Sequence, residues 1–158
     1  MRGNGGGYLD TSVAVLSELI SGQQTASIIK KRDTSKNETV KTNGSGKLAD
    51  IPLVILVDKG SASASEIVAG AIQDYKRGLV IGEKTFGKGS VQELVKLDDG
   101  ATLRLTIAKW FTPLNRTIDE TGVTPDKEVK ITDDDIKAER DTQLDAAVSY
   151  LKSYRKRQ

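Results

Sequence analysis

The 158-residue sequence contains neither cysteine nor histidine. The lack of cysteine excludes thiol catalysis, disulfides and thiolate metal ligands. The lack of histidine excludes imidazole metal ligands and the Ser-His-Asp triad, because no imidazole base is present. A hydroxyl nucleophile in this chain would have to be activated by a carboxylate, a lysine or a group from another chain.

The sequence also lacks a charge excess and a long apolar segment. The formal net charge is +2, with acidic and basic residues mixed along the chain, so a nucleic-acid partner is not expected. No apolar run is long enough to cross a bilayer, and the first residues form a polar glycine run instead of the apolar core of a signal peptide. We expect the basic end, residues 152–157, to be a solvated helix terminus.

The chain length fits one domain, which we assign to residues 1–158. Apolar spacing predicts a helix over residues 9–20, and strands are predicted over residues 25–33 and 38–41. Residues 43–46, Asn-Gly-Ser-Gly, are expected to form a flexible link.

The middle of the chain predicts a strand, a helix and a second strand. Residues 51–57 form a continuous apolar run, which indicates a central strand covered on both faces. A helix is predicted to reach Arg77 with Gly78 as its C-terminal cap, and residues 79–82 form the second strand. This order with tight links implies a right-handed parallel crossover, so the fold class is α/β.

A β-hairpin and a helix are predicted after the crossover. The strand-like residues 91–97 and 102–110 flank Asp-Asp-Gly, a good hairpin turn. One final helix, residues 134–154, is expected to bury five apolar side chains: Ile136, Leu144, Ala147, Val148 and Leu151.

Three serines lie where the first buried strand meets the helix: Ser61, Ser63 and Ser65. Such a junction exposes a side chain above unpaired backbone N–H groups, which suits a nucleophile and the oxyanion of acyl transfer. Ser63 and Glu66 also have the spacing of a capping box, and this structural interpretation competes with the catalytic one.

Residues 82–88 match the Gly-x-x-x-x-Gly-Lys half of a phosphate-binding P-loop. Two features oppose nucleotide binding. Gly89 stands where a serine or threonine should bind magnesium, and residues 90–95 alternate like a strand where a P-loop opens a helix.

The glycines around Lys88 suggest a second role, because they let the backbone approach closely and place the ammonium group in an apolar pocket. Burial lowers the pKa of a lysine, as a lysine general base requires. The alternative is a lysine on a mobile surface loop. Gln92 lies four residues on, about 13 Å away at strand rise, so direct contact would need the chain to bend at Gly89.

Three ordered segments resemble the carboxyl-terminal processing proteases, also called tail-specific proteases. Residues 2–9 are similar to the family's Arg-Gly-Asn-Pro-Gly-Gly segment, residues 60–67 to its nucleophile segment and residues 82–92 to its lysine segment. Residues 122–126 and 141–144 add two weaker matches. The resemblance implies that Ser63 is the nucleophile, Lys88 the general base and Gln92 the residue that orients the lysine.

The resemblance also implies an oxyanion hole made by the backbone N–H groups of Ala64 and of a residue in the glycine segment, for which Gly6 is preferred over Gly7. The sequence departs from the family pattern at one place, since Gly5 replaces the usual proline and loosens this segment.

The family's fold is a crotonase-like α/β core, its substrates are unstructured protein C-termini, and it needs no cofactor. Family members carry an export signal or membrane anchor and a substrate-binding PDZ domain before this region, so the chain resembles a catalytic core without them, from an extracytoplasmic protein. The strand that leads into the glycine segment is also missing, which leaves an edge that could pair with another copy. The main hypothesis is a serine endopeptidase, and the alternatives are a non-catalytic scaffold or a nucleotide binder.

Overall fold

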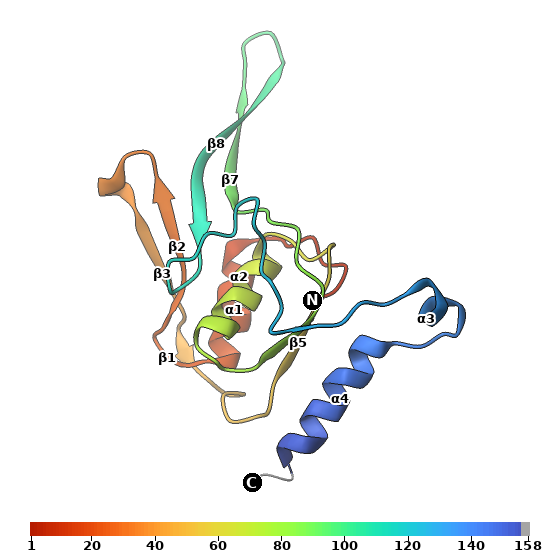
Figure 1. The fold of residues 1–158 in the computed structure, drawn as a ribbon. Helices are drawn as coiled ribbons and strands as arrows, with labels where there is room; N and C mark the ends of the chain where they lie inside the picture. Colours follow the sequence, from red (N-terminus) through yellow and green to blue (C-terminus); the bar gives the residue numbers. More distant parts are fainter. Residues whose placement is uncertain (156–158) are drawn as a thin grey trace.

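The computed structural model describes residues 1–155, in which helices and small sheets surround one apolar core (Figure 1). Helix α1 (Leu9–Leu19) confirms the first predicted helix and packs against α2 (Ala64–Asp74). The core contains buried side chains from α1 and α2, namely Leu16, Ile67, Val68 and Ile72, and from the strands around them, namely Ile29, Val57, Val80 and Trp110.

The predicted crossover is present. Strand β5 (Val54–Val57) precedes α2 in the sequence and strand β6 (Leu79–Gly82) follows it, and the two strands pair in parallel. The prediction of a central first strand is wrong, because the sheet order is β5-β6-β9, with β9 at Lys127–Glu128. Strand β5 therefore lies at an edge, and Val54 and Leu56 are only half-buried.

Helix α2 stops earlier than predicted, at Asp74. Lys76, with φ 51°, adopts the left-handed conformation just after the helix, so Gly78 is not its C-terminal cap as predicted. Gly78 serves close packing instead, because a Cβ there would lie 2.7 Å from the carbonyl oxygen of Leu53. A helix end is set by such contacts as well as by the nearest glycine.

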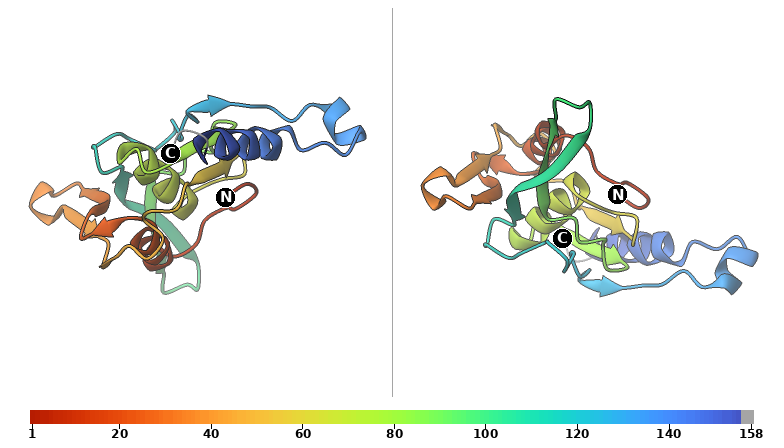
Figure 2. Two further views of the ribbon diagram at one scale, coloured as in Figure 1. Left: turned by 90° about the horizontal axis from the view of Figure 1, so that it is seen from below. Right: turned by 90° about the horizontal axis from the view of Figure 1, so that it is seen from above.

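The second large sheet is antiparallel, in the order β3-β2-β8-β7. Its strands are β2 (Thr25–Lys31), β3 (Glu38–Lys41), β7 (Ser90–Lys96) and β8 (Thr102–Phe111), with the 3-10 turn η1 (Thr34–Lys36) between the first two. The predicted β7–β8 hairpin is confirmed, and its far half stands clear of the body as an arm (Figures 1 and 2). The expected flexible link is partly wrong, since β4 (Gly44–Ser45) pairs with β1 (Ser21–Gly22).

The final helix is broken into α3 (Asp133–Lys137) and α4 (Thr142–Arg155). Glu139, with φ 51°, ends the first piece, and the Asp141 carboxylate accepts a hydrogen bond from the Leu144 N–H at 3.0 Å to open the second. Of the five side chains predicted to be buried, Ala147 is buried and Leu151 half-buried, whereas three are exposed: Ile136, Leu144 and Val148. Residues 156–157 of the predicted basic terminus lie outside the described residues.

Helix α4 packs against β5 and β6 and so covers one face of the parallel sheet. Among residues 1–155, no helix has the length and apolar character needed to span a membrane.

Gly82→Ala should destabilise the fold strongly. A Cβ there would lie 1.9 Å from the Val57 carbonyl oxygen, while Gly100, which also has a positive φ, has no atom within 4 Å of its Cβ position. We expect Gly82→Ala to lose about 3 kcal/mol more unfolding free energy than Gly100→Ala. Urea unfolding of the two variants measures the difference, and equal losses would contradict this packing.

Candidate active site

Ser63 occupies a sharp turn between β5 and α2. Its φ of 53° and ψ of −117° are a strained conformation for a residue with a Cβ, which costs about 1–3 kcal/mol and is typical of functional sites. The Ser63 hydroxyl faces the Glu66 N–H, as in a capping box, but it accepts no hydrogen bond from that group. The Glu66 N–H donates instead to the Ser63 carbonyl oxygen at 2.9 Å. The strain thus serves to present the side chain.

The two neighbouring serines are engaged in the structure. The Ser61 hydroxyl donates to the Met1 carbonyl at 2.9 Å, and the Ser65 hydroxyl donates to the Asn4 carbonyl at 3.0 Å. Both residues are buried, while Ser63 is half-buried. Of the three candidates, Ser63 is therefore the one whose hydroxyl is left for chemistry.

The Glu66 carboxylate ties this turn to the lysine segment. Glu66 is fully buried, and its oxygens accept four hydrogen bonds, from the N–H groups of Ser63 (2.8 Å), Gly87 (2.7 Å) and Lys88 (2.9 Å) and from the Thr85 hydroxyl (2.5 Å). The N–H groups of Ser63 (2.8 Å) and Lys88 (2.9 Å) donate to the same Glu66 oxygen. The two backbone nitrogens are therefore close neighbours around that oxygen. The sequence indicated Glu66 only as a capping residue.

The Lys88 segment is held closely by its glycines. A Cβ on Gly89 would lie 2.2 Å from the Asp119 backbone nitrogen, and Gly87 accepts a hydrogen bond from Glu120 at 2.9 Å. The close approach predicted for these glycines is present, but the predicted apolar pocket is not, because the Lys88 side chain is exposed. The chain then enters strand β7, so no helix N-terminus follows for a phosphate, which opposes nucleotide binding.

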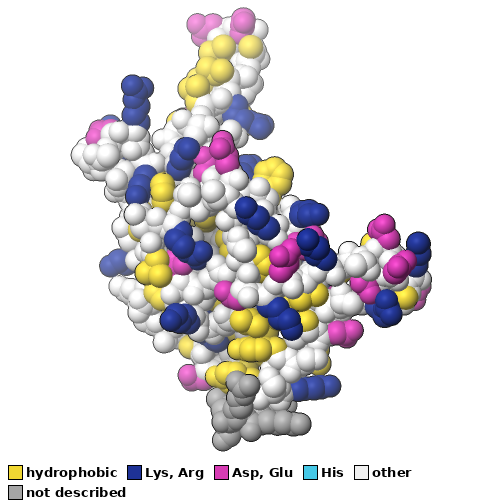
Figure 3. All heavy atoms as spheres, viewed as in Figure 1, with side chains coloured by type: hydrophobic (Ala, Val, Ile, Leu, Met, Phe, Trp, Pro, Cys, Tyr) yellow, Lys and Arg dark blue, Asp and Glu magenta, His cyan; other side chains and the backbone are white. Residues whose placement is uncertain are grey.

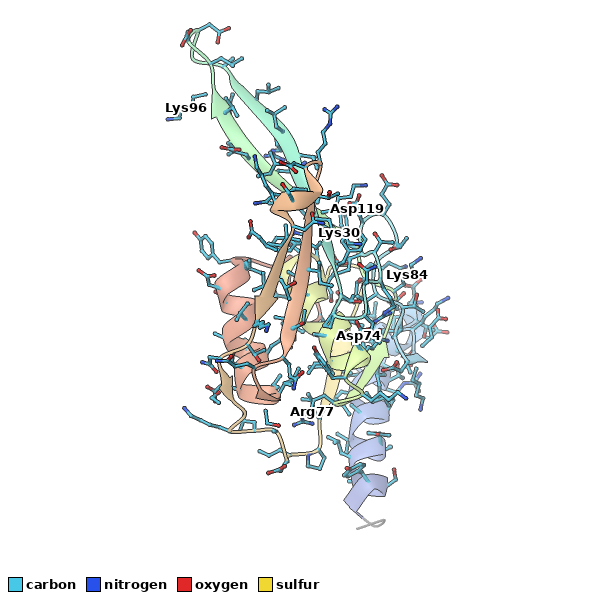
Figure 4. The ribbon with its side chains drawn as sticks, turned by 90° about the vertical axis from the view of Figure 1, so that its left-hand side faces the viewer. Lys30, Asp74, Arg77, Lys84, Lys96 and Asp119 are labelled. Atoms are coloured by element: carbon cyan, nitrogen blue, oxygen red, sulfur yellow. The ribbon has the colours of Figure 1, made fainter. Side chains whose placement is uncertain are left out.

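Gln92 lies on β7 with an exposed side chain. The ladder between β7 and β8 shifts register between Val91 and Gln92, and a bulge of this kind re-aims side chains beside active sites. Within residues 1–155 no hydrogen bond joins the Gln92 side chain to Lys88. Figure 4 shows this region from the side, with Lys84 of the same loop on the body and Lys96 out on the arm.

The glycine segment lies directly against the Ser63 turn. A Cβ on Gly6 would lie 2.7 Å from the Ser63 Cβ and 2.9 Å from the Ala64 nitrogen, whereas Gly7 has no atom within 4 Å of its Cβ position. The Ala64 N–H, at the start of α2, has no hydrogen-bond acceptor among the described residues. The Gly6 N–H donates to the Asn4 side-chain oxygen at 2.9 Å, so it is occupied in this conformation.

Side chains from two distant elements fix the glycine segment. The Asp58 carboxylate, after β5, accepts the Gly3 N–H at 2.9 and 3.0 Å. The Arg2 guanidinium donates to both Asp141 oxygens at 2.6 and 2.7 Å, before α4. The hydrogen bond from Arg2, with help from the Leu144 N–H, lowers the pKa of Asp141 to about 2. Motif spacing did not reveal these contacts, because they join residues far apart in the sequence.

The described residues offer no cluster of three or more acidic side chains arranged to hold a metal ion.

Glu66→Gln should loosen the site, because an amide presents an NH₂ group to N–H donors that now bind carboxylate oxygens. We expect a loss of about 2–4 kcal/mol in unfolding free energy, as for a buried charged acceptor. The exposed Glu93→Gln on β7 is the control and should stay within about 0.5 kcal/mol of the wild type. Urea unfolding, with hydrogen exchange of the Gly87 and Lys88 amides, tests this, and unchanged exchange would contradict the linkage.

Asp141→Asn should have a pH-dependent effect. The pKa of Asp141 is lowered in the folded protein, so the ion pair with Arg2 contributes stability at neutral pH that is lost as pH falls from about 4 toward 2. Because the Asp141 side chain is 37% exposed, the variant should lose only about 1 kcal/mol at pH 7. Urea unfolding across this range should show the two proteins converging in acid, and a constant difference would contradict the pair.

The fold and sequence match those of known peptidases. The family model for peptidase family S41 matches residues 1–129. The chain is 38% identical to a carboxyl-terminal-processing protease of Synechocystis over 154 residues, which are 96% of this chain and 35% of that protein. It is 54% identical to the chloroplastic carboxyl-terminal-processing peptidase 2 of Arabidopsis thaliana over 86 residues, 54% of this chain and 17% of that one.

Solved structures agree. The photosystem II D1 C-terminal processing protease superposes with a TM-score of 0.72 at 38% identity, covering 82% of this chain and 33% of that one. A Bacteroides fragilis protein described as an S41 protease gives 0.78 at 19% identity, over 98% and 44% of the two chains, which shows the fold alone. The chain spans about a third of the length of the first curated relatives. The predicted crotonase-like α/β fold is confirmed, and the chain belongs to peptidase family S41.

Proposed function

We propose that this chain carries the catalytic serine and lysine of an endopeptidase that cleaves proteins near unstructured C-termini. The observation that carries the proposal is the strained Ser63 turn, tied through the buried Glu66 carboxylate to the backbone of Lys88. A free hydroxyl and an amine are thereby held on adjoining segments, in a chain with no histidine or cysteine to replace them.

In this mechanism the neutral Lys88 amine takes the proton of the Ser63 hydroxyl as its oxygen attacks the peptide carbonyl. The Ala64 N–H stabilises the oxyanion, together with the Gly6 N–H once Asn4 releases it. The Lys88 ammonium then protonates the leaving amine, and water, deprotonated by Lys88, hydrolyses the acyl-enzyme. Gln92 orients the lysine, and no cofactor takes part.

The exposure of Lys88 adds a requirement. A lysine base must be desolvated, and the described residues do not bury it. We infer that the bound substrate, or another part of the complete protein such as a PDZ domain, covers Lys88 during catalysis. The same exposure favours a second candidate, in which this piece alone is a non-catalytic scaffold. A serine-directed covalent probe separates the two, because an active Ser63 becomes labelled and a scaffold does not.

The substrates would be protein or peptide tails, and the setting would be extracytoplasmic. Chloroplastic proteins are among the relatives, which is compatible with a compartment outside the cytoplasm.

Ser63→Ala and Lys88→Ala should each lower kcat for a tail peptide by at least about 10³-fold in the complete protein, because each removes one half of the dyad. Lys84→Ala is the matched control, since Lys84 is an exposed lysine of the same loop, and it should leave kcat within about twofold of the wild type. Gln92→Ala should fall between them. Substantial turnover by either dyad variant would reject the mechanism.

A further inference from the structure

Strand β7 is an unpaired edge that begins beside the candidate lysine. It is the last strand of the β3-β2-β8-β7 sheet, and among residues 1–155 no strand pairs with its outer side. It starts at Ser90, two residues after Lys88. An open edge presents a row of backbone N–H and C=O groups to any extended chain.

The hairpin register shows which groups face outward. The Leu97 N–H donates to the Ala101 carbonyl at 2.9 Å, so this pair is hydrogen-bonded across the hairpin. Because antiparallel pairs alternate, the backbone groups of Lys96 and Leu94 point away from β8, while those of Val95 point toward it. Position 94 therefore offers a free N–H and a free C=O at the edge.

The far half of this hairpin lacks the support that strands usually have. Strand β2 pairs with β8 only from Ala108 to Phe111. The earlier residues of β8, 102–107, therefore have β7 as their only neighbouring strand among the described residues. Two-stranded ribbons are marginally stable in water, and a third strand stabilises them. The arm also exposes apolar residues on both of its strands (Figure 3), each of them 42–62% exposed: Leu94, Leu97, Leu103, Leu105 and Ile107.

We propose that an extended substrate segment pairs with the outer edge of β7 as an added strand, which leads its main chain to Ser63 and Lys88. The inference rests on the proposed peptidase function and names how the substrate is recognised. Main-chain pairing holds any unstructured polypeptide, and the exposed leucines favour apolar side chains in it. Within the described part of the chain, the outer side of β8 is also unpaired over residues 102–107, but only β7 begins beside Lys88. We therefore assign the substrate to β7.

Leu94→Pro in the complete protein tests this edge. Proline removes the outward N–H without breaking a bond to β8, and edge strands tolerate proline at such positions. Leu94→Ala is the matched control, since it removes the side chain and keeps the N–H. For an unstructured fluorogenic tail peptide, we expect Leu94→Pro to lower kcat/KM about tenfold more than Leu94→Ala.

Labelling of Ser63 by a small fluorophosphonate without a peptide chain provides the second measurement, and its rate should be the same in both variants. Equal kcat/KM for the two variants would overturn the added strand. Slower labelling of the proline variant would also overturn it, because the edge would then support the site itself. Absence of labelling in the wild-type protein would instead reject the proposed function.

Discussion

The arrangement of the site depends on one buried carboxylate. Glu66 has no solvent exposure, and a charge in such a place is tolerated only when hydrogen bonds satisfy it. Its donors come from the serine turn and from the lysine segment, which are separated in the sequence by helix α2 and strand β6. Neither segment can shift without leaving part of a buried charge unpaired. The relative position of the Ser63 and Lys88 backbones is thus set by their contacts to a third residue.

The second element of the site, the glycine segment, is held by polar contacts from outside. Asp58 comes from the end of β5, and Asp141 from the turn before α4. The family model matches residues 1–129, yet Asp141 lies beyond that range and still fixes Arg2 at the start of the segment. The broken C-terminal helix is therefore part of the support of the site. Its break places an acidic residue at the N-terminus of α4, where the carboxylate caps the helix and binds the arginine.

The sequence predicts local elements well, because each has a local pattern. The bounds of β3 and β6 are as predicted, and the β7–β8 hairpin follows from its Asp-Asp-Gly turn. The sequence did not reveal the edge position of β5, which depends on distant segments, or the occupation of the Gly6 N–H by Asn4, and it left open whether Lys88 is buried or exposed. Glu66 illustrates the limit. Its spacing to Ser63 predicts a capping box, while its bonds to Thr85, Gly87 and Lys88 join residues about twenty positions away.

Chain topology also orders the assembly of the protein. The β5-α2-β6 crossover is contiguous and can form as soon as residues 54–82 are available, whereas β2 must wait for β8, and Arg2 for Asp141. Contacts of large sequence separation form late, since the connecting chain must first close a long loop. During synthesis the serine turn and its contacts with the glycine segment could thus form before the lysine segment joins them. The ion pair that holds Arg2 can form only after Asp141 has been made, so the support of the glycine segment from α4 comes late.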